Sequence, residues 1–217
     1  GDFSAAGINL VSNPNFTEGT EEAIALTSWT AYTSGASTVT YDGAVAELNI
    51  DASNSNVGIY QNNIFSLGKS YKVVLSMKAT ATFDAEVVEG NGPVTITKLG
   101  NVSLTTSYQT FTFYHVGTGT YDLFIHRLFN EAGAASQTIS IQSVSVKELG
   151  ADWGQFADVF PVFNASGVTL NNSNGIDQKF FQSAVITSGK SYKVSYEITA
   201  ASYTTGSLKY YKGDGYV

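Results

Sequence analysis

The sequence predicts an all-β protein made of tandem antiparallel β-sandwich domains, of which the second is incomplete in this chain. The 217 residues include 13 Tyr, 13 Phe and 21 Gly but only 3 Pro, and 13% are charged. Aromatic residues suit half-buried pleated faces, and glycine supplies turns. Alternation of apolar and polar residues and an internal repeat are the other two observations behind this prediction.

Charge and cysteine content exclude several classes of protein. The net charge is −7 with no cluster of Lys or Arg, so binding of nucleic acid is not expected. No apolar run approaches the roughly 20 residues of a membrane-spanning helix, so no membrane insertion is expected. The absence of Cys removes disulfides, thiolate metal sites and cysteine nucleophiles together.

The internal repeat is visible as "GKSYKV", which occurs at Gly68–Val73 and again at Gly189–Val194. A constant shift of 121 residues also matches "IYQNNIFSLGKSYKV" with "FFQSAVITSGKSYKV", so the match covers a strand, a turn and a second strand. The shared pattern predicts a duplicated domain.

Both copies of the second strand in this repeat alternate with a period of two. The residues predicted to face inward are Tyr71, Val73, Leu75, Met77 and Ala79 in the first copy and Tyr192, Val194, Tyr196, Ile198 and Ala200 in the second. Lysines alternate with them, so each strand should have one buried and one solvated face.

Other elements of the first copy follow in order. We expect an opening strand at 8–16, at most one helical turn at Ala23–Leu26, and a hairpin of 108–116 with 121–129 around "GTGT". That hairpin would set His115 opposite Asp122. The closing strand is "QTISIQSVSVKEL", with Ile139, Ile141, Val144 and Val146 inward.

The two predicted domains are 8–149 and 150–217. Val217 corresponds to about Ile96 of the first copy, so the later hairpin and closing strand have no counterpart among these residues. Either the chain is a fragment of a longer protein or a partner supplies the missing strands. We favour the fragment.

Acidic residues offer no convincing catalytic centre. Asp84 and Glu86 would lie about 7 Å apart on one strand face, a spacing that glycosidases use. With Glu89 they are nevertheless expected on a solvated face, because no pocket is evident. The two histidines, His115 and His126, lie too far apart along the predicted hairpin to share a metal.

Aromatic rings suggest a sugar-stacking surface as an alternative to core packing. The candidates are Trp29, Tyr32, Tyr60 and Phe181, with the amides of Gln61 and Gln182 nearby. Because neighbouring strand residues point to opposite faces, Tyr60 and Gln61 cannot both line one groove. Trp29 in particular is expected to pack in the core.

The order of "NLVSNPNF", Trp29, "GKSYKV", "TTSYQTFTF" and "ISIQSVSVKEL" resembles the carbohydrate-binding-module-like jelly rolls of the galactose-binding type. The resemblance implies jelly-roll sandwiches, which occur in secreted glycosidases and in virion proteins of tailed bacteriophages. It also implies a calcium position near the opening turn, where this chain has Thr17 followed by Glu18, and Gln142 where the final strand commonly has Asp. Glu18 is therefore a weak calcium candidate, and no metal or other cofactor is expected.

These observations lead to a functional hypothesis of a non-enzymatic structural and adhesive protein at the virion surface of a tailed phage. It would be a fibre or capsid-decoration component with an extracellular location. Its partners would be further copies of itself, other virion proteins and a host-surface glycan. The alternative is the carbohydrate-binding module region of a secreted glycosidase.

Overall fold

The computed structural model describes residues 6–16, 28–41, 44–127, 133–151, 153–156, 161–164, 167–170, 179–182, 185–193, 195–198, 211–212 and 215–216. The chain divides into two units, 1–183 and 184–217, which are considered separately. All regular elements in the described ranges are β-strands, as predicted.

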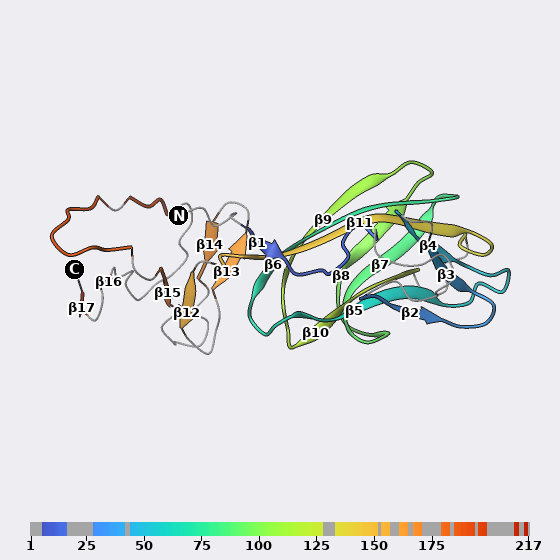
Figure 1. Cartoon of the computed structure of the whole chain (residues 1–217), viewed down its shortest axis with the longest axis horizontal. Helices are drawn as coiled ribbons and strands as arrows, with labels where there is room; N and C mark the ends of the chain where they lie inside the picture. The colour runs from blue at the N-terminus through green and yellow to red at the C-terminus, as the bar shows by residue number, and fades with distance from the viewer. Residues whose placement is uncertain are drawn as a thin grey trace. The chain divides into compact units, whose positions relative to one another are not determined.

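Two antiparallel sheets form a β-sandwich within the first unit (Figure 1). The first sheet has the order β3-β4-β11-β6-β9, with β1 also paired to β11: β1 (Ala6–Asn9), β3 (Thr38–Tyr41), β4 (Ala46–Asn49), β6 (Ser70–Ala79), β9 (Gln109–Val116) and β11 (Thr138–Leu149). The second has the order β2-β5-β10-β7-β8: β2 (Thr30–Thr33), β5 (Val57–Phe65), β7 (Phe83–Asn91), β8 (Val94–Leu104) and β10 (Tyr121–Arg127).

The core between the two sheets confirms the predicted alternation. All five inward residues of β6 are at most 3% exposed, and Ile139, Ile141, Val144 and Val146 of β11 are at most 1% exposed. Trp29 is also in this core, with its ring centroid 5.6 Å from that of Phe16. Burial of these side chains supplies the main stabilising term for a chain without disulfides.

The predicted hairpin of 108–116 with 121–129 is wrong. β9 pairs with β6 in the first sheet, whereas β10 pairs with β5 and β7 in the second. The link between them crosses from one sheet to the other and is held by Gly117, which bonds through its N–H and carbonyl to the turn at Gly68 and Lys69. A short glycine-containing link fits either connection, so its sequence did not distinguish them.

The repeated turn has the same local structure in both copies. Gly68 has φ 73° and Gly189 has φ 76°, the left-handed conformation that glycine adopts without strain. The Ser66 N–H donates to the Tyr71 hydroxyl over 2.9 Å, and at the equivalent positions of the second copy, 121 residues on, Thr187 N–H donates to Tyr192 over 2.9 Å. The repeated sequence therefore adopts the same turn and the same local hydrogen bond in both copies.

The pairing of β2 with β5 also recurs. In the second copy, β12 (Gly154–Phe156) pairs with β15 (Lys179–Phe181). The two copies can be aligned on Trp29 and Trp153, each of which directly precedes the first of the paired strands. The pairs in the first copy are Thr30↔Tyr60, Ala31↔Ile59 and Tyr32↔Gly58. The corresponding pairs in the second are Gly154↔Phe181, Gln155↔Phe180 and Phe156↔Lys179. The register is the same in both. Two further short antiparallel pairs are β13 (Val162–Asn164) with β14 (Gly167–Thr169) and β16 (Tyr211–Lys212) with β17 (Gly215–Tyr216).

The strand predicted over 192–200 is wrong wherever it is described. Residues 191–193 and 195–198 form no strand, and Tyr192, Tyr196 and Ile198 are 47–70% exposed. In the first copy the equivalent strand β6 lies between β9 and β11. Residues 191–193 and 195–198 have no such neighbours in any sheet of the described part of the chain. Val194 and Ala200 lie outside the described residues, as does the predicted turn at Ala23–Leu26.

Candidate functional site

The outer face of the second sheet carries an unusual set of side chains in two cross-strand rows. One row runs Tyr32–Gly58–His126–Glu86–Asn101, and the next runs Thr30–Tyr60–Phe124–Val88–Lys98. Alternate residues of each strand point away from the core here, yet Glu86, Val88, Phe124 and His126 are at most 4% exposed. This face is therefore packed rather than simply solvated.

Aromatic rings build one half of this face. The Phe124 ring stacks on the His126 ring with centroids 4.3 Å apart and an interplanar angle of 17°. Tyr32 and Tyr60 approach the Phe124 ring edge-on, at 5.8 Å and 6.3 Å between centroids. Both tyrosines remain partly exposed. The result is an aromatic floor, formed by the stacked Phe124 and His126 rings and flanked by two partly exposed phenol rings.

Gly58 makes this arrangement sterically feasible. A Cβ at this position would lie 2.6 Å from both Phe124 Cε2 and His126 Cβ, and 2.7 Å from the Ile125 carbonyl oxygen. Because glycine has no side chain, the Phe124 ring can occupy the space over Gly58 of β5. A glycine inside a strand often marks a site where other atoms approach the backbone closely, and Gly58 is such a site.

Charged groups build the other half of the face. The Glu86 carboxylate forms an ion pair with Lys98 through Oε1, and its Oε2 lies 3.3 Å from His126 Nε2. The His126 Nδ1–H donates to the Arg127 carbonyl over 2.5 Å. Burial lowers the pKa of His126 below its ordinary value of 6.5, against the smaller opposing effects of that hydrogen bond and of Glu86. The imidazole is therefore held in its neutral form at pH 7.

His126 should make the protein less stable in mild acid. A histidine with a lowered pKa in the folded state stabilises the fold fully above the unfolded pKa of about 6.5, and this stability is lost as the pH falls below it. We expect the unfolding free energy to fall as the pH drops below about 6.5, by at most about 1.4 kcal/mol per pH unit. In urea unfolding over this range, the variant His126→Gln should show a shallower slope than the wild type. Equal slopes would contradict the assignment.

The sequence-predicted ligand residues are only partly brought together. Tyr32 and Tyr60 share the outer face, whereas Trp29 is 4% exposed in the core and offers no ring face to a sugar. Phe181 lies on β15 and is 48% exposed. As predicted, Tyr60 and Gln61 point to opposite faces.

The Gln61 amide is already engaged in the structure. It accepts from Ser12 N–H and donates to the carbonyls of Ser12 and Ser28. It therefore ties the loop after β1 to the start of β2 rather than lining a groove.

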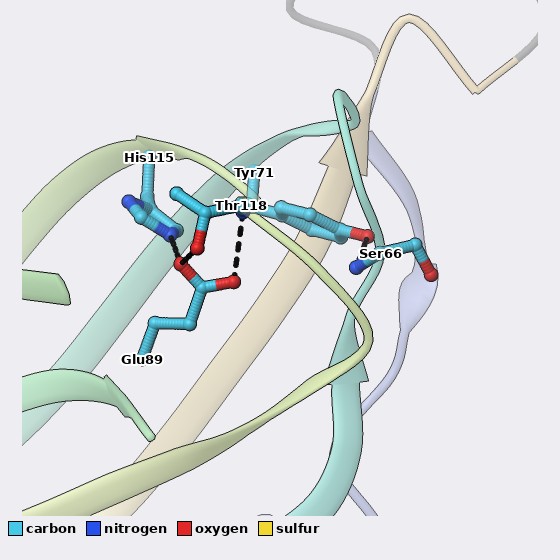
Figure 2. A network of polar contacts seen from close by, with 5 residues as sticks. All are labelled: Ser66, Tyr71, Glu89, His115 and Thr118. Atoms are coloured by element: carbon cyan, nitrogen blue, oxygen red, sulfur yellow. Dashed lines mark hydrogen bonds and ion pairs between the residues drawn. The ribbon is translucent and has the colours of Figure 1, made fainter. Parts of the chain in front are cut away.

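The prediction of a solvated acidic face is wrong for two of its three residues. Glu86 faces outward in its ion pair, and Glu89 faces inward with 0% exposure. The Glu89 Oε2 lies 2.9 Å from His115 Nε2, and Glu89 also accepts from the Thr118 backbone N–H and hydroxyl (Figure 2). This network links β7 of one sheet with β9 of the other.

The predicted pairing of His115 with Asp122 is also wrong. Asp122 lies in the second sheet, where its two carboxylate oxygens accept from the backbone N–H groups of Asn63 and Gly92. Tyr71 is paired with His115 across β6 and β9, and its hydroxyl accepts a hydrogen bond from the Ser66 N–H (Figure 2). Burial raises the pKa of Tyr71, whereas the exposed counterpart Tyr192 has a pKa lowered by its hydrogen bond to Thr187.

A metal site receives no support from the described side chains. No group of three His, Asp or Glu in the described ranges is placed to hold a metal ion. The calcium candidate Glu18 lies outside those ranges, and Gln142 accepts a hydrogen bond from Ser76 over 3.1 Å. The described ranges likewise contain no helix of the length and apolarity required to cross a membrane.

A shallow hollow of about 330 Å³ lies on the first sheet, away from the tyrosines. Its lining residues are Glu47, Lys78, Ala79, Thr80, Thr106, Thr138 and Ser140. None of the predicted ligand residues takes part in it.

No protein-family model and no curated protein matches the chain. Among solved structures, it is similar to the enzymatically active domain of tailspike protein 4 from bacteriophage CBA120, at 20% identity and a TM-score of 0.48, covering 65% of this chain and 22% of that one. It is also similar to a CBM4 structure (18% identity, TM-score 0.44, 56% of this chain and 94% of that one). A family 29 carbohydrate-binding module mutant complexed with mannohexaose matches at 16% identity and a TM-score of 0.42, covering 56% and 81% of the two chains.

Sequence reasoning missed Phe124, Glu86, His126 and Lys98 as members of the outer face. One signal was available in "LFIH", Leu123–His126, which has large side chains at both alternating positions. Such a strand is covered on both sides rather than on one. The partners that cover it come from β2, β7 and β8, and no local pattern identifies them.

Proposed function

We propose that this protein is a non-enzymatic adhesive component of a tailed-phage virion, a fibre or capsid-decoration protein, that binds a host-surface glycan through the outer face of its second sheet. The observation that carries the glycan-binding part is the placement of Tyr32 and Tyr60 on one face, against a shared aromatic floor. The virion part is supported by the sequence resemblance, the low charge and the internal sequence repeat.

The chemistry of this face suits a sugar chain. Tyrosine combines an apolar ring, which can stack on the C–H face of a sugar, with a hydroxyl that can bond to it. The two rows end in polar groups at Asn101 and Lys98, which can meet sugar hydroxyls. Packing of the Phe124 ring beneath both tyrosines fixes their positions before binding, which reduces the entropy cost of association.

The arrangement of carboxylates supports a non-enzymatic role. Glu86 and Glu89 lie on opposite faces of β7, and Asp84 accepts a hydrogen bond from the Ser103 hydroxyl over 2.6 Å. A glycosidase needs two carboxyl groups that flank one bond in a common cleft. Among the described residues these three acidic groups do not provide such a pair.

Replacing either tyrosine should weaken glycan binding while leaving the fold intact. We expect Tyr32→Ala and Tyr60→Ala each to reduce affinity about tenfold, since truncating a central aromatic contact typically costs more than 1 kcal/mol. Binding can be measured on an array of host and plant polysaccharides, followed by titration. The matched control is Tyr114→Ala, a 48% exposed tyrosine on the other sheet. Equal losses in all three variants would contradict the proposed site.

The virion role has a separate test. The purified protein should form oligomers or bind virion shells, and it should not cleave the polysaccharide that it binds. Turnover that persists after repurification would reject the non-enzymatic role. Selective binding of plant or algal polysaccharide, without oligomers or shell binding, would favour the module of a secreted glycosidase.

A further inference from the structure

We propose that the chain carries a second sugar-stacking site on β12 and β15, with Phe181 as its exposed ring. This inference rests on the proposed function of the first copy. It concerns a separate surface, so the two can fail independently.

The first argument is the shared register of the two copies. Phe181 lies opposite Gly154 as Tyr60 lies opposite Thr30, and Phe156 holds the register position of Tyr32 opposite Lys179. Both tyrosine positions of the first copy are therefore occupied by aromatic residues in the second.

The second argument is which ring packs inward. The Trp153 ring lies 5.2 Å from that of Phe180, and Phe163 meets Phe180 edge-on at 6.3 Å. Trp29 and Ile59, the equivalent residues of the first copy, are both in the core. Because side chains alternate along a strand, Phe181 must point to the other side of β15, and its 48% exposure agrees with this.

The second site should differ from the first in its sugar preference. Phe156 is paired with Lys179, whereas Tyr32 is paired with Gly58. Because equivalent register positions carry different residue types, we expect two classes of site.

Calorimetric titration with mannohexaose, cellohexaose and hexagalacturonate tests this directly. The wild type should bind at least one of them with two sites per chain. Phe181→Ala and Tyr60→Ala should each weaken one site about tenfold and leave the other unchanged, and their combination should weaken both. Tyr114→Ala is the control, because its ring has the same 48% exposure as Phe181, and it should retain both sites.

Retention on an immobilised polysaccharide provides a second readout, since two linked sites raise apparent affinity. The Phe181→Ala variant should show an apparent affinity for the immobilised polysaccharide that is about a hundredfold lower than that of the wild type. One site per chain, removed by Tyr60→Ala and unaffected by Phe181→Ala, would overturn the second site while leaving the proposed function standing. No binding of any probe by the wild type would overturn both.

Discussion

Replacing Glu89 with alanine should lower the free energy of unfolding by about 3–5 kcal/mol, the cost expected when one member of a buried polar network is removed. Glu89 is fully buried and accepts hydrogen bonds from His115 Nε2, the Thr118 N–H and the Thr118 hydroxyl. Its removal leaves His115 Nε2, on a side chain that is 8% exposed, without this acceptor, whereas the groups of the exposed Thr118 can bond to water. It also cuts the polar link between β7 and β9, which belong to different sheets.

Urea unfolding followed by circular dichroism measures this effect. The matched control is Glu148→Ala, which breaks the ion pair with Lys69 at 2.8 Å. That pair is partly exposed, so its loss should cost less than about 1 kcal/mol. Glu89→Gln keeps the shape and one acceptor oxygen and should fall between the two. If Glu89→Ala cost no more than Glu148→Ala, the network would have no stabilising role.

Features encoded by neighbouring residues were predicted well. The alternation in β6 and β11 identified the buried face of each strand. Alternate side chains of a strand share one face, so the face that carries the apolar residues must be the one against the core. The turn before Tyr71 was also evident from "GKSYKV". Its hydrogen bond from Ser66 spans five residues, and the same bond forms at Tyr192, whose described neighbours at 191–193 and 195–198 form no strand.

Features that depend on distant partners were not predicted. Carboxylates are seldom buried without a partner, so Glu89 is expected at the surface when its partners are unknown. Those partners, His115 and Thr118, lie 26 and 29 residues further along the chain. The error over the link between β9 and β10 had a wider effect. A hairpin at this link places β10 beside β9, which hides the pairing of Phe124 with Tyr60 on β5.

The candidate site was therefore only half predicted. Tyr32 and Tyr60 were chosen for their ring chemistry, and the structure places them together through the pairing of β2 with β5. Their shared floor comes from β10, and the charged half of the face comes from β7 and β8. Those strands meet by sheet topology, which residue type and spacing do not determine.

Replacing Gly58 with alanine should destabilise the protein by about 1–3 kcal/mol, the range for overpacking a filled site. The direction of the change in unfolding free energy is the informative result, because replacing a glycine inside a strand with alanine ordinarily stabilises a protein by roughly 0.5–1 kcal/mol. Here the added Cβ would lie 2.6 Å from the Phe124 ring and 2.7 Å from the Ile125 carbonyl oxygen. The ring can move only by leaving the two tyrosines, and the carbonyl only by disturbing the pairing of β5 with β10.

The control is Gly167→Ala on β14, where a Cβ would have no atom within 4 Å. Urea unfolding should show a loss of stability for Gly58→Ala and little change for Gly167→Ala. The near-ultraviolet circular dichroism of the first variant should also change, because displacement of Phe124 releases the rings of Tyr32 and Tyr60 from their edge-on contacts. Glycan affinity should fall with it, since the tyrosines would lose the floor that orients them. A Gly58→Ala protein more stable than the wild type, with unchanged glycan binding, would show that no ring lies over β5 and that the aromatic face is not preorganised.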